Sequence, residues 1–183
     1  MIDLSAKEFY KMLEGESISE DSLQELVVRK LGEMKLKVAT AESCTGGLVS
    51  KRITEVSGSS DVFECGVCSY ANRIKHKLLG VSEETLNTVG AVSPETAAQM
   101  ARGVRKLADA DFGISTTGIA GPTGATADKP VGLVYMAVAG EKETVVIKSN
   151  LGDAEDNSRE GIRKAASSAV LYYLYKALLS VKI

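Results

Sequence analysis

The fold is decided by residues 36–47, which read Leu36-Lys37-Val38-Ala39-Thr40-Ala41-Glu42-Ser43-Cys44-Thr45-Gly46-Gly47. The first six residues are typical of a β-strand, and from about Leu48 to Glu55 the apolar spacing is helical. A strand that enters a helix through a glycine-containing turn is the repeating unit of α/β proteins. Residues 36–55 therefore predict a strand–turn–helix unit, with its turn at Ser43.

Downstream of this unit the chain keeps alternating between strands and helices. The predicted strands are Val62–Tyr70, Phe112–Thr117, Val131–Ala139 and Thr144–Ser149. The predicted helices are Asn72–Leu79, Ser93 to about Ala108, and about Ser158 to Val181. The segment Gly140-Glu141-Lys142 predicts a hairpin, and hence one antiparallel pair. We therefore expect a three-layer α/β domain with a mostly parallel sheet.

The first 35 residues are predicted to be purely helical, an extension in front of a domain at residues 36–183. Ser5 is the expected cap of a helix over Ala6–Leu13. Ser19 or Asp21 is the expected cap of a second helix. Its apolar stripe consists of Leu23, Leu26, Val27 and Leu31, which recur at i, i+3 and i+4 spacing.

The composition excludes several classes of partner. Hydrophobic residues make up 44% and charged residues 25%, as in ordinary globular domains. A net charge of −2 and an aromatic content of 5% leave no footprint for nucleic acid. No apolar run approaches the roughly 20 residues of a membrane span, and the N-terminus lacks a signal-peptide core. We expect a cytoplasmic protein without nucleic-acid or membrane partners.

Three cysteines, Cys44, Cys65 and Cys68, and the single His76 limit the metal and redox chemistry. An odd cysteine count without a secretory signal argues against a disulfide framework. Cys65 and Cys68 match C-x-x-C, but residues three apart in a strand point to opposite faces. We expect two buried core cysteines rather than a redox or metal pair. One histidine cannot supply a catalytic triad or a multi-histidine metal site.

Two residues are candidates for nucleophilic catalysis. Ser43 precedes a predicted helix N-terminus, where backbone N–H groups can form an oxyanion hole or a phosphate cradle. Alternatively, Ser43 is an N-cap beside two packing glycines. Lys75 lies about one helical turn beyond Tyr70, and a lysine of lowered pKa can act as the base of a serine. Alternatively, Lys75 belongs to a solvated face. The pattern alone leaves both questions open.

The glycine-rich segment at residues 116–124 is a third candidate. It reads Thr116-Thr117-Gly118-Ile119-Ala120-Gly121-Pro122-Thr123-Gly124. It matches neither a Walker A loop nor G-x-G-x-x-G. Its glycines allow backbone amides to approach an anion closely. A plain strand-to-strand connection is an equal alternative.

Six segments, taken in order, resemble the CinA C-terminal domain family, also called nicotinamide-nucleotide amidases. They are residues 40–47, Gly58-Ser59-Ser60, Tyr70-Ala71-Asn72-Arg73-Ile74-Lys75, Gly90-Ala91-Val92-Ser93, residues 118–124 and Lys129-Pro130-Val131-Gly132. The resemblance runs from about Leu36 to the C-terminus, and AESCTGG at 41–47 with GIAGPTG at 118–124 is a specific pair. It implies an α/β/α sandwich over a mixed sheet of about five strands.

The resemblance also implies an activity: hydrolytic deamidation of nicotinamide mononucleotide to nicotinic acid mononucleotide and ammonia, in pyridine nucleotide recycling. Neither a metal nor a cofactor is implied. Ser43 is the implied nucleophile, Lys75 its base, and Tyr70 a hydroxyl that assists proton transfer. The expected substrate-binding residues are Cys44, Thr45, Gly46 and Gly47, which hold the oxyanion through their amides, with Thr117, Gly118, Gly121, Arg159 and Arg163.

One departure from the family concerns the two arginines. The family tends to read Gly-Asp-Arg before the last helix, with a second arginine four residues on. Here Ala154 follows Gly152-Asp153, and we interpret the residues before Arg159 and Arg163 as a short insertion that preserves the pair.

The sequence has no counterpart of the larger N-terminal domain of many bacterial CinA proteins, so we expect its pyrophosphatase chemistry to be absent. The helices before Leu36 are longer than a minimal member needs, and we expect them to contribute contacts in a homo-oligomer. The alternative function is a non-catalytic nucleotide-binding or partner-docking module. The joint presence of Ser43, Tyr70 and Lys75 argues against that alternative.

Overall fold

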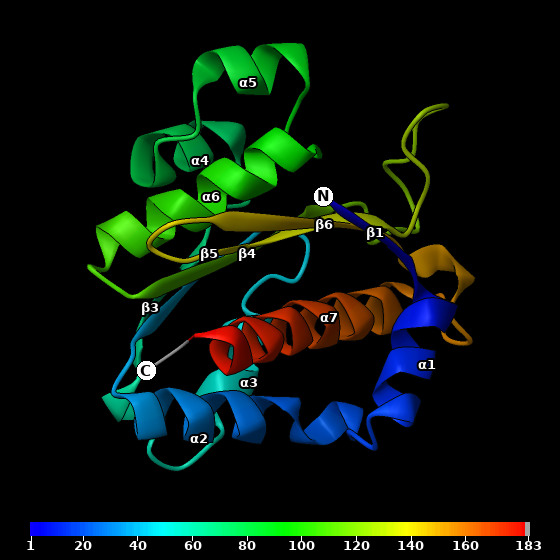
Figure 1. Ribbon diagram of the computed structural model, residues 1–183. Coiled ribbons are helices and arrows are strands. Elements are labelled where there is room, and N and C mark those ends of the chain that lie inside the picture. Colours follow the sequence, from blue (N-terminus) through cyan, green and yellow to red (C-terminus); the bar gives the residue numbers. More distant parts are fainter. Residues whose placement is uncertain (182–183) are drawn as a thin grey trace.

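A six-stranded sheet lies between two layers of helices in the computed structural model, which describes residues 1–181 (Figure 1). The strands are β1 (Ile2–Ser5), β2 (Val38–Glu42), β3 (Phe63–Cys68), β4 (Phe112–Gly118), β5 (Leu133–Ala139) and β6 (Thr144–Asn150). Their order in the sheet is β1-β6-β5-β4-β2-β3. The expected α/β/α architecture is confirmed, with six strands instead of about five.

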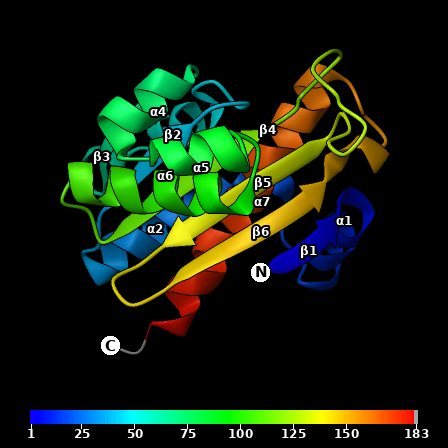
Figure 2. The same cartoon turned by 90° about the horizontal axis from the view of Figure 1, so that it is seen from above.

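Helices cover both faces of the sheet. They are α1 (Ala6–Gly15), α2 (Leu23–Met34), α3 (Leu48–Thr54), α4 (Asn72–Leu79), α5 (Glu83–Thr88), α6 (Pro94–Leu107) and α7 (Arg159–Ser180). Three short 3₁₀ turns lie at Glu20–Ser22, Ser59–Asp61 and Leu151–Asp153. Figure 2 shows α4, α5 and α6 on the near face of the sheet, with α7 passing behind it. No helix within residues 1–181 is long and apolar enough to cross a bilayer.

The N-terminal segment differs from its prediction, because residues 2–5 form a strand and not a helix. This strand, β1, pairs in parallel with β6 at the edge of the sheet. Four residues are too few to show a periodic pattern, so the strand had no signal in the sequence. The expected cap at Ser5 is confirmed, and Ser5 forms a capping box with Glu8.

The second predicted cap is wrong. A 3₁₀ turn at Glu20–Ser22 leads into α2, so neither Ser19 nor Asp21 is its N-cap, and the residue in that position, Ser22, makes no side-chain cap bond. The apolar residues of α1 and α2 share one core with α7, among them Phe9, Leu23, Leu31, Leu171 and Leu174. The domain boundary at residue 36 stays a prediction.

Strand directions are mixed. The pairs β1–β6, β2–β3 and β2–β4 are parallel, whereas β5 is antiparallel to both β4 and β6. The predicted β5–β6 hairpin is confirmed, but the expectation of a single antiparallel pair is wrong. A parallel pair needs a crossover connection, which is usually a helix. Residues 119–132, which join β4 to β5, contain no helix, so β5 returns antiparallel to β4.

The cysteines of β3 are less buried than expected. Cys65 is half-buried and packs toward the layer of α4 and α6, while Cys68 is exposed. Exposure alternates along β3, in agreement with the prediction that the two thiols point to opposite faces. The expectation of two buried core cysteines is wrong, because β3 is an edge strand and is not covered on every side.

Parallel packing brings three loops to one edge of the sheet. β2, β3 and β4 run in the same direction, so Ser43, Tyr70 and the loop after Gly118 all follow the carboxyl ends of neighbouring strands. The helix that follows β3, α4, is held close to α6, where any side chain at Gly103 would overlap the Leu79 carbonyl. Ligands bind at such edges in α/β sheets.

Candidate active site

The turn after β2 places Ser43 directly at the edge of the sheet. Its backbone N–H donates to the Thr116 carbonyl of β4 at 3.0 Å. Gly46 and Gly47 have φ angles of +60° and +96°, a region in which side chains are strained. The N-cap of α3 is Gly47, so the interpretation of Ser43 as an N-cap is wrong.

A buried carboxylate, that of Glu42, organises this turn. Its side chain is 1% exposed and accepts hydrogen bonds at both oxygens. Oε2 accepts from the Thr45 hydroxyl at 2.6 Å, the Gly47 amide at 2.9 Å and the Val49 amide at 3.1 Å. Oε1 accepts from the amide and the hydroxyl of Ser50 at 2.8 and 2.7 Å. The carboxylate thus satisfies the amides and the positive end of α3.

The same contacts decide which amides can bind a substrate. Three amides at the start of α3, including that of Gly47, are occupied by Glu42. Within residues 1–181 the backbone N–H groups of Cys44, Thr45 and Gly46 donate to no acceptor in the protein. The turn therefore leaves three amides without an acceptor in the protein, whereas the Gly47 amide is already bound by Glu42, and the expected oxyanion role of these amides stays a prediction.

Lys75 lies on α4, the helix that follows β3, and its side chain reaches Ser43. Its side chain is 1% exposed, so the interpretation as a solvated face residue is wrong. Lys75 Nζ lies 3.1 Å from Ser43 Oγ, 2.6 Å from the Ser69 carbonyl and 3.3 Å from the Tyr70 carbonyl. Burial lowers the pKa of Lys75 from 10.5 to about 8. A substantial fraction of this amine is therefore neutral near physiological pH.

In the structure Lys75 Nζ donates all three of these hydrogen bonds, as a protonated amine does. A neutral lysine has two N–H donors and one lone pair. When Lys75 is neutral, its two N–H donors can stay on the Ser69 and Tyr70 carbonyls, and its lone pair can accept from the Ser43 hydroxyl. Ser43 can then donate its proton to Lys75, which is the arrangement of an activated nucleophile and its base.

Cys44, next to the proposed nucleophile, is in a different electrostatic state. Its side chain is 6% exposed, and burial raises the pKa of its thiol to about 12. A thiol with such a pKa is protonated near neutral pH and is a poor nucleophile. Its high pKa therefore makes Cys44 a weaker candidate for the nucleophile than Ser43.

Tyr70 is exposed at the same edge, and its hydroxyl accepts a hydrogen bond from Arg159 Nη2 at 3.4 Å. In the part of the chain that the structure describes, this hydroxyl makes no hydrogen bond to Ser43 or Lys75. The proton-transfer role that the family resemblance implies for Tyr70 stays a prediction.

Both arginines of α7 reach the loops around Ser43. Arg163 donates from Nε and Nη2 to the Thr45 carbonyl, at 3.1 and 2.6 Å. Arg159 Nη1 donates to the Gly121 carbonyl at 2.6 Å. The first two turns of α7 thus fasten the Ser43 turn and the glycine-rich loop, with cationic groups at the edge of the site.

The other predicted residues of the glycine-rich segment serve packing here. Thr117 is buried, and its hydroxyl donates to the Ala91 carbonyl at 2.7 Å. A Cβ at Gly118 would lie 2.6 Å from the Leu133 carbonyl oxygen, and one at Gly121 would lie 2.6 Å from a Val131 methyl group. The backbone therefore requires these glycines whether or not an anion binds. Within residues 1–181 no group of three or more His, Cys, Asp or Glu side chains could hold a metal ion.

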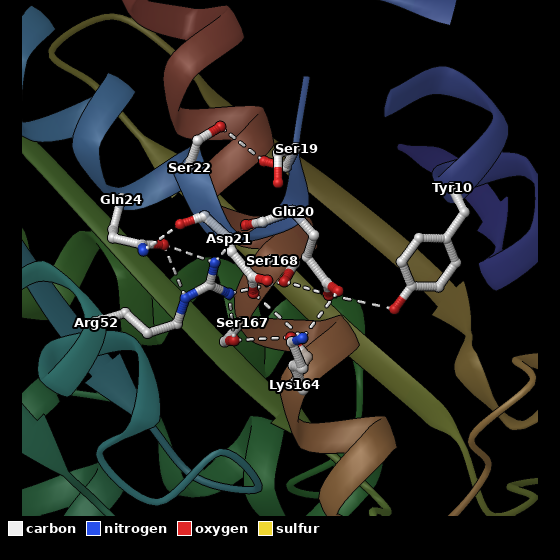
Figure 3. A network of polar contacts seen from close by, with 10 residues as sticks. All are labelled: Tyr10, Ser19, Glu20, Asp21, Ser22, Gln24, Arg52, Lys164, Ser167 and Ser168. Atoms are coloured by element: carbon white, nitrogen blue, oxygen red, sulfur yellow. Dashed lines mark hydrogen bonds and ion pairs between the residues drawn. The ribbon is translucent and has the colours of Figure 1, made fainter. Parts of the chain in front are cut away.

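A second buried charge, Arg52, anchors the far end of α3 (Figure 3). The guanidinium donates to Ser167 and Ser168 of α7 at 2.8 and 2.7 Å, and to Gln24 and the Glu20 carbonyl at 2.7 Å each. Sequence reasoning missed both Glu42 and Arg52. The signal for Glu42 was an acidic residue between a buried strand and a helix N-terminus.

Fold and site together define a class of protein. It is an α/β/α sandwich in which a buried lysine contacts a half-buried serine at the carboxyl edge of the parallel strands. The chain belongs to the CinA C-terminal domain family, whose model matches residues 20–178.

Individual relatives agree with this assignment. A competence-damage inducible protein of Thermoanaerobacter sp. (strain X514) is 50% identical over 91% of this chain, and a CinA-like protein of Kosmotoga olearia is 49% identical over 88%. The chain spans 40% and 38% of the length of these two relatives. The crystal structure of a competence/damage inducible protein from Agrobacterium tumefaciens is 41% identical, with a TM-score of 0.83 over 88% of this chain and 96% of that one.

The central position of Glu42 predicts a large effect of Glu42→Gln. An amide would place N–H donors opposite the donors of Thr45, Gly47 or Ser50, so we expect a loss of about 2–4 kcal/mol in the free energy of unfolding. Urea denaturation at pH 7 measures it. The matched control is Glu55→Gln, which removes an exposed ion pair with Lys51 at the C-terminal end of α3 and should cost less than about 1 kcal/mol. Equal effects of the two substitutions would contradict the role given to Glu42.

Proposed function

We propose that this chain is a nicotinamide-nucleotide amidase, which hydrolyses nicotinamide mononucleotide to nicotinic acid mononucleotide and ammonia. The observation that carries the proposal is the 3.1 Å contact between Ser43 Oγ and the buried Lys75 Nζ, whose pKa is lowered to about 8. A protein that only bound a nucleotide would need an anion site but no lysine of lowered pKa against a serine.

The first step of the proposed reaction forms an ester. Ser43 Oγ attacks the carboxamide carbon as its proton passes to neutral Lys75. The amides of Cys44, Thr45 and Gly46 stabilise the resulting oxyanion. The carbon–nitrogen bond then breaks, and the departing nitrogen takes the proton from Lys75 to leave as ammonia. Lys75 is neutral again at the end of this step.

The second step hydrolyses the ester. A water molecule attacks the ester carbon while Lys75 accepts one of its protons. The bond between this carbon and Ser43 Oγ breaks, and the proton returns from Lys75 to Ser43. The products are the free enzyme and the carboxylic acid, which loses its proton to solvent and leaves as the carboxylate.

Two arginines support a phosphorylated substrate. Arg159 and Arg163 lie on the first two turns of α7, and both line a hollow of about 630 Å³ beside Leu48 at the start of α3. Two further cations and three acidic side chains also line this hollow, namely Arg52, Lys164, Asp21, Glu55 and Glu160, whereas Ser43 and Lys75 do not. A guanidinium suits a phosphate group because its donors match the phosphate oxygens. Two grounds lead to the nicotinamide nucleotide as the proposed substrate. The resemblance to the CinA C-terminal domain family implies it, and the two arginines can bind its phosphate.

The substrate assignment predicts selective release of ammonia. Nicotinamide mononucleotide should be deamidated, and free nicotinamide should be a poor substrate, because binding energy from the remote phosphate is used at the reacting carbon. An ammonia assay over pyridine nucleotides and simple amides measures this. Equal efficiency on the two compounds would rule out the proposed specificity, and no ammonia from any compound would favour a non-catalytic nucleotide-binding module.

Variants of the serine–lysine pair should behave as one unit. Ser43→Ala and Lys75→Ala should each lower kcat roughly a thousandfold or more, and the double variant should lose little further. Lys75→Arg should stay inactive, since an arginine does not give up its proton at these pH values. Cys44→Ala is the matched control and should keep most activity, because its backbone N–H is retained. An active Ser43→Ala with an inactive Cys44→Ala would overturn the mechanism.

The pH dependence follows from the lowered pKa of Lys75. Protonated Lys75 cannot accept the Ser43 proton, so kcat/KM should rise with pH and level off above a pKa of about 8. A steady-state profile between pH 6 and 10 measures this. Cys44→Ala should leave the inflection in place, because the Cys44 thiol has a pKa of about 12. A profile without an inflection between pH 7 and 9 would contradict Lys75 as the base.

A further inference from the structure

Residues 122–128, in the connection between β4 and β5, form a fully exposed loop. All seven side chains of this β4–β5 loop are open to solvent. In the part of the chain that the structure describes, the hydrogen bonds of these residues stay within the loop and its base, where Thr126 and Lys129 bind each other. Figure 1 shows the loop projecting away from the sheet. Packing therefore does not fix its position.

The β4–β5 loop begins beside the candidate active site. Arg159 Nη1 donates to the carbonyl of Gly121, the residue in front of the loop, at 2.6 Å. One turn further along α7, Arg163 donates to the Thr45 carbonyl in the turn that carries Ser43. Residues four apart on a helix lie on the same face. The loop and the Ser43 turn are therefore fastened to one face of α7.

A second cation fastens the other end of the loop. Lys129 Nζ donates to the Val89 carbonyl at the C-terminal end of α5, at 2.9 Å. Both acceptors, the carbonyls of Gly121 and Val89, are neutral. Within residues 1–181 neither Arg159 nor Lys129 forms an ion pair with a carboxylate. Two positive charges with neutral partners thus hold the two ends of the loop.

An anion binds such cations more strongly than a carbonyl oxygen does. A phosphate adds a Coulomb attraction that a neutral carbonyl lacks, and a guanidinium can bind it through two parallel hydrogen bonds. A phosphorylated substrate at this edge therefore competes with the two carbonyls for Arg159 and Lys129. When the cations bind the phosphate instead, both ends of the loop are released.

The composition of the loop suits a movable cover. It reads Pro122-Thr123-Gly124-Ala125-Thr126-Ala127-Asp128, so no large side chain has to leave a packed position when the loop moves. Gly124, at its third position, can adopt either sign of φ without strain. Exposed segments with few contacts rearrange at a low cost in free energy, and active-site lids are drawn from such segments.

We propose that the β4–β5 loop is a lid, which Arg159 and Lys129 latch open and which is released when these cations bind an anionic group of the substrate. The inference rests on the proposed function in one respect, namely that the substrate is a phosphorylated nucleotide. The released loop folds over the nucleotide beside Ser43. Closure covers the loop backbone and keeps the nucleotide in place during the reaction.

Proteolysis by elastase tests the latch without any ligand. Elastase cleaves after small residues such as Ala125 and Ala127, and the rate follows the population of cleavable conformers. Lys129→Met and Arg159→Met should each raise the cleavage rate within the loop about tenfold, because each removes one of its two attachments. The matched control, Lys142→Met, changes an exposed lysine of the β5–β6 turn and should leave the rate unchanged. Wild-type rates in both latch variants would overturn the proposal.

Addition of the nucleotide tests closure. Ser43→Ala is used so that the nucleotide is not consumed, and calorimetry gives the concentration of nicotinamide mononucleotide that saturates it. At saturation, elastase should cleave the loop about tenfold more slowly, while cleavage at other sites, located by mass spectrometry, stays the same. Sodium chloride at equal ionic strength controls for salt. An unchanged rate within the loop at saturation would contradict a lid.

The lid and the amidase activity can fail separately. Binding and loop protection without any release of ammonia by the wild type would leave the lid in place and remove the proposed function. Release of ammonia without loop protection would do the reverse. If calorimetry detects no binding of the nucleotide, both proposals fail. Thermal melting followed by circular dichroism checks that every variant is folded.

Discussion

The carboxylate of Glu42 is the interaction on which the active-site edge depends. A buried carboxylate is costly unless both of its oxygens are satisfied, and here five donors from Thr45, Gly47, Val49 and Ser50 satisfy them. These donors are spread over residues 45–50, so their contacts with the carboxylate hold the course of this segment. In that arrangement Gly46 and Gly47 have positive φ angles, and the amides of residues 44–46 make no hydrogen bond to the carboxylate. The amides that we propose for the oxyanion are thus those that Glu42 does not bind.

Arg52 and Lys75 are both buried basic side chains, but they have different partners and therefore different roles. Arg52 is bound by hydroxyl, amide and carbonyl oxygens from α2, α7 and the turn before α2, and it fastens α3 to both helices. An arginine keeps its charge even when buried, so it serves as an anchor. Lys75 has two carbonyls and the Ser43 hydroxyl as partners, and burial lowers its pKa to about 8. A buried lysine of lowered pKa can lose its proton near neutral pH, so Lys75 can act as a base where Arg52 cannot.

Much of the fold could be predicted from the sequence where the signals were long or local. The strand–turn–helix around Ser43, the helix opened by Ser93 and Pro94, and the last hairpin all have several residues of periodic pattern or definite turn chemistry. The strand at residues 2–5 was too short to give a pattern. The exposure of Cys68 depends on β3 being an edge strand, which the strand order decides and no local segment encodes. The pairing of Ser43 with Lys75 followed from the family resemblance. The hydrogen bonds from the Gly47 amide to Glu42 and from Arg163 to the Thr45 carbonyl could not be predicted, because they depend on the three-dimensional arrangement of the turn and of α7.

In the reaction that we propose, Ser43 forms a covalent ester with the acyl group of the substrate. An activated aryl ester of nicotinic acid mononucleotide has a better leaving group than the amide, so its acyl-enzyme should accumulate before hydrolysis. Acid quenching followed by peptide mass spectrometry locates the acyl group. The predicted result is an adduct on the peptide that contains Ser43, fragmented to that side chain, and no adduct in Ser43→Ala. An adduct on Cys44, or rapid hydrolysis of the ester without any adduct on Ser43, would contradict the account.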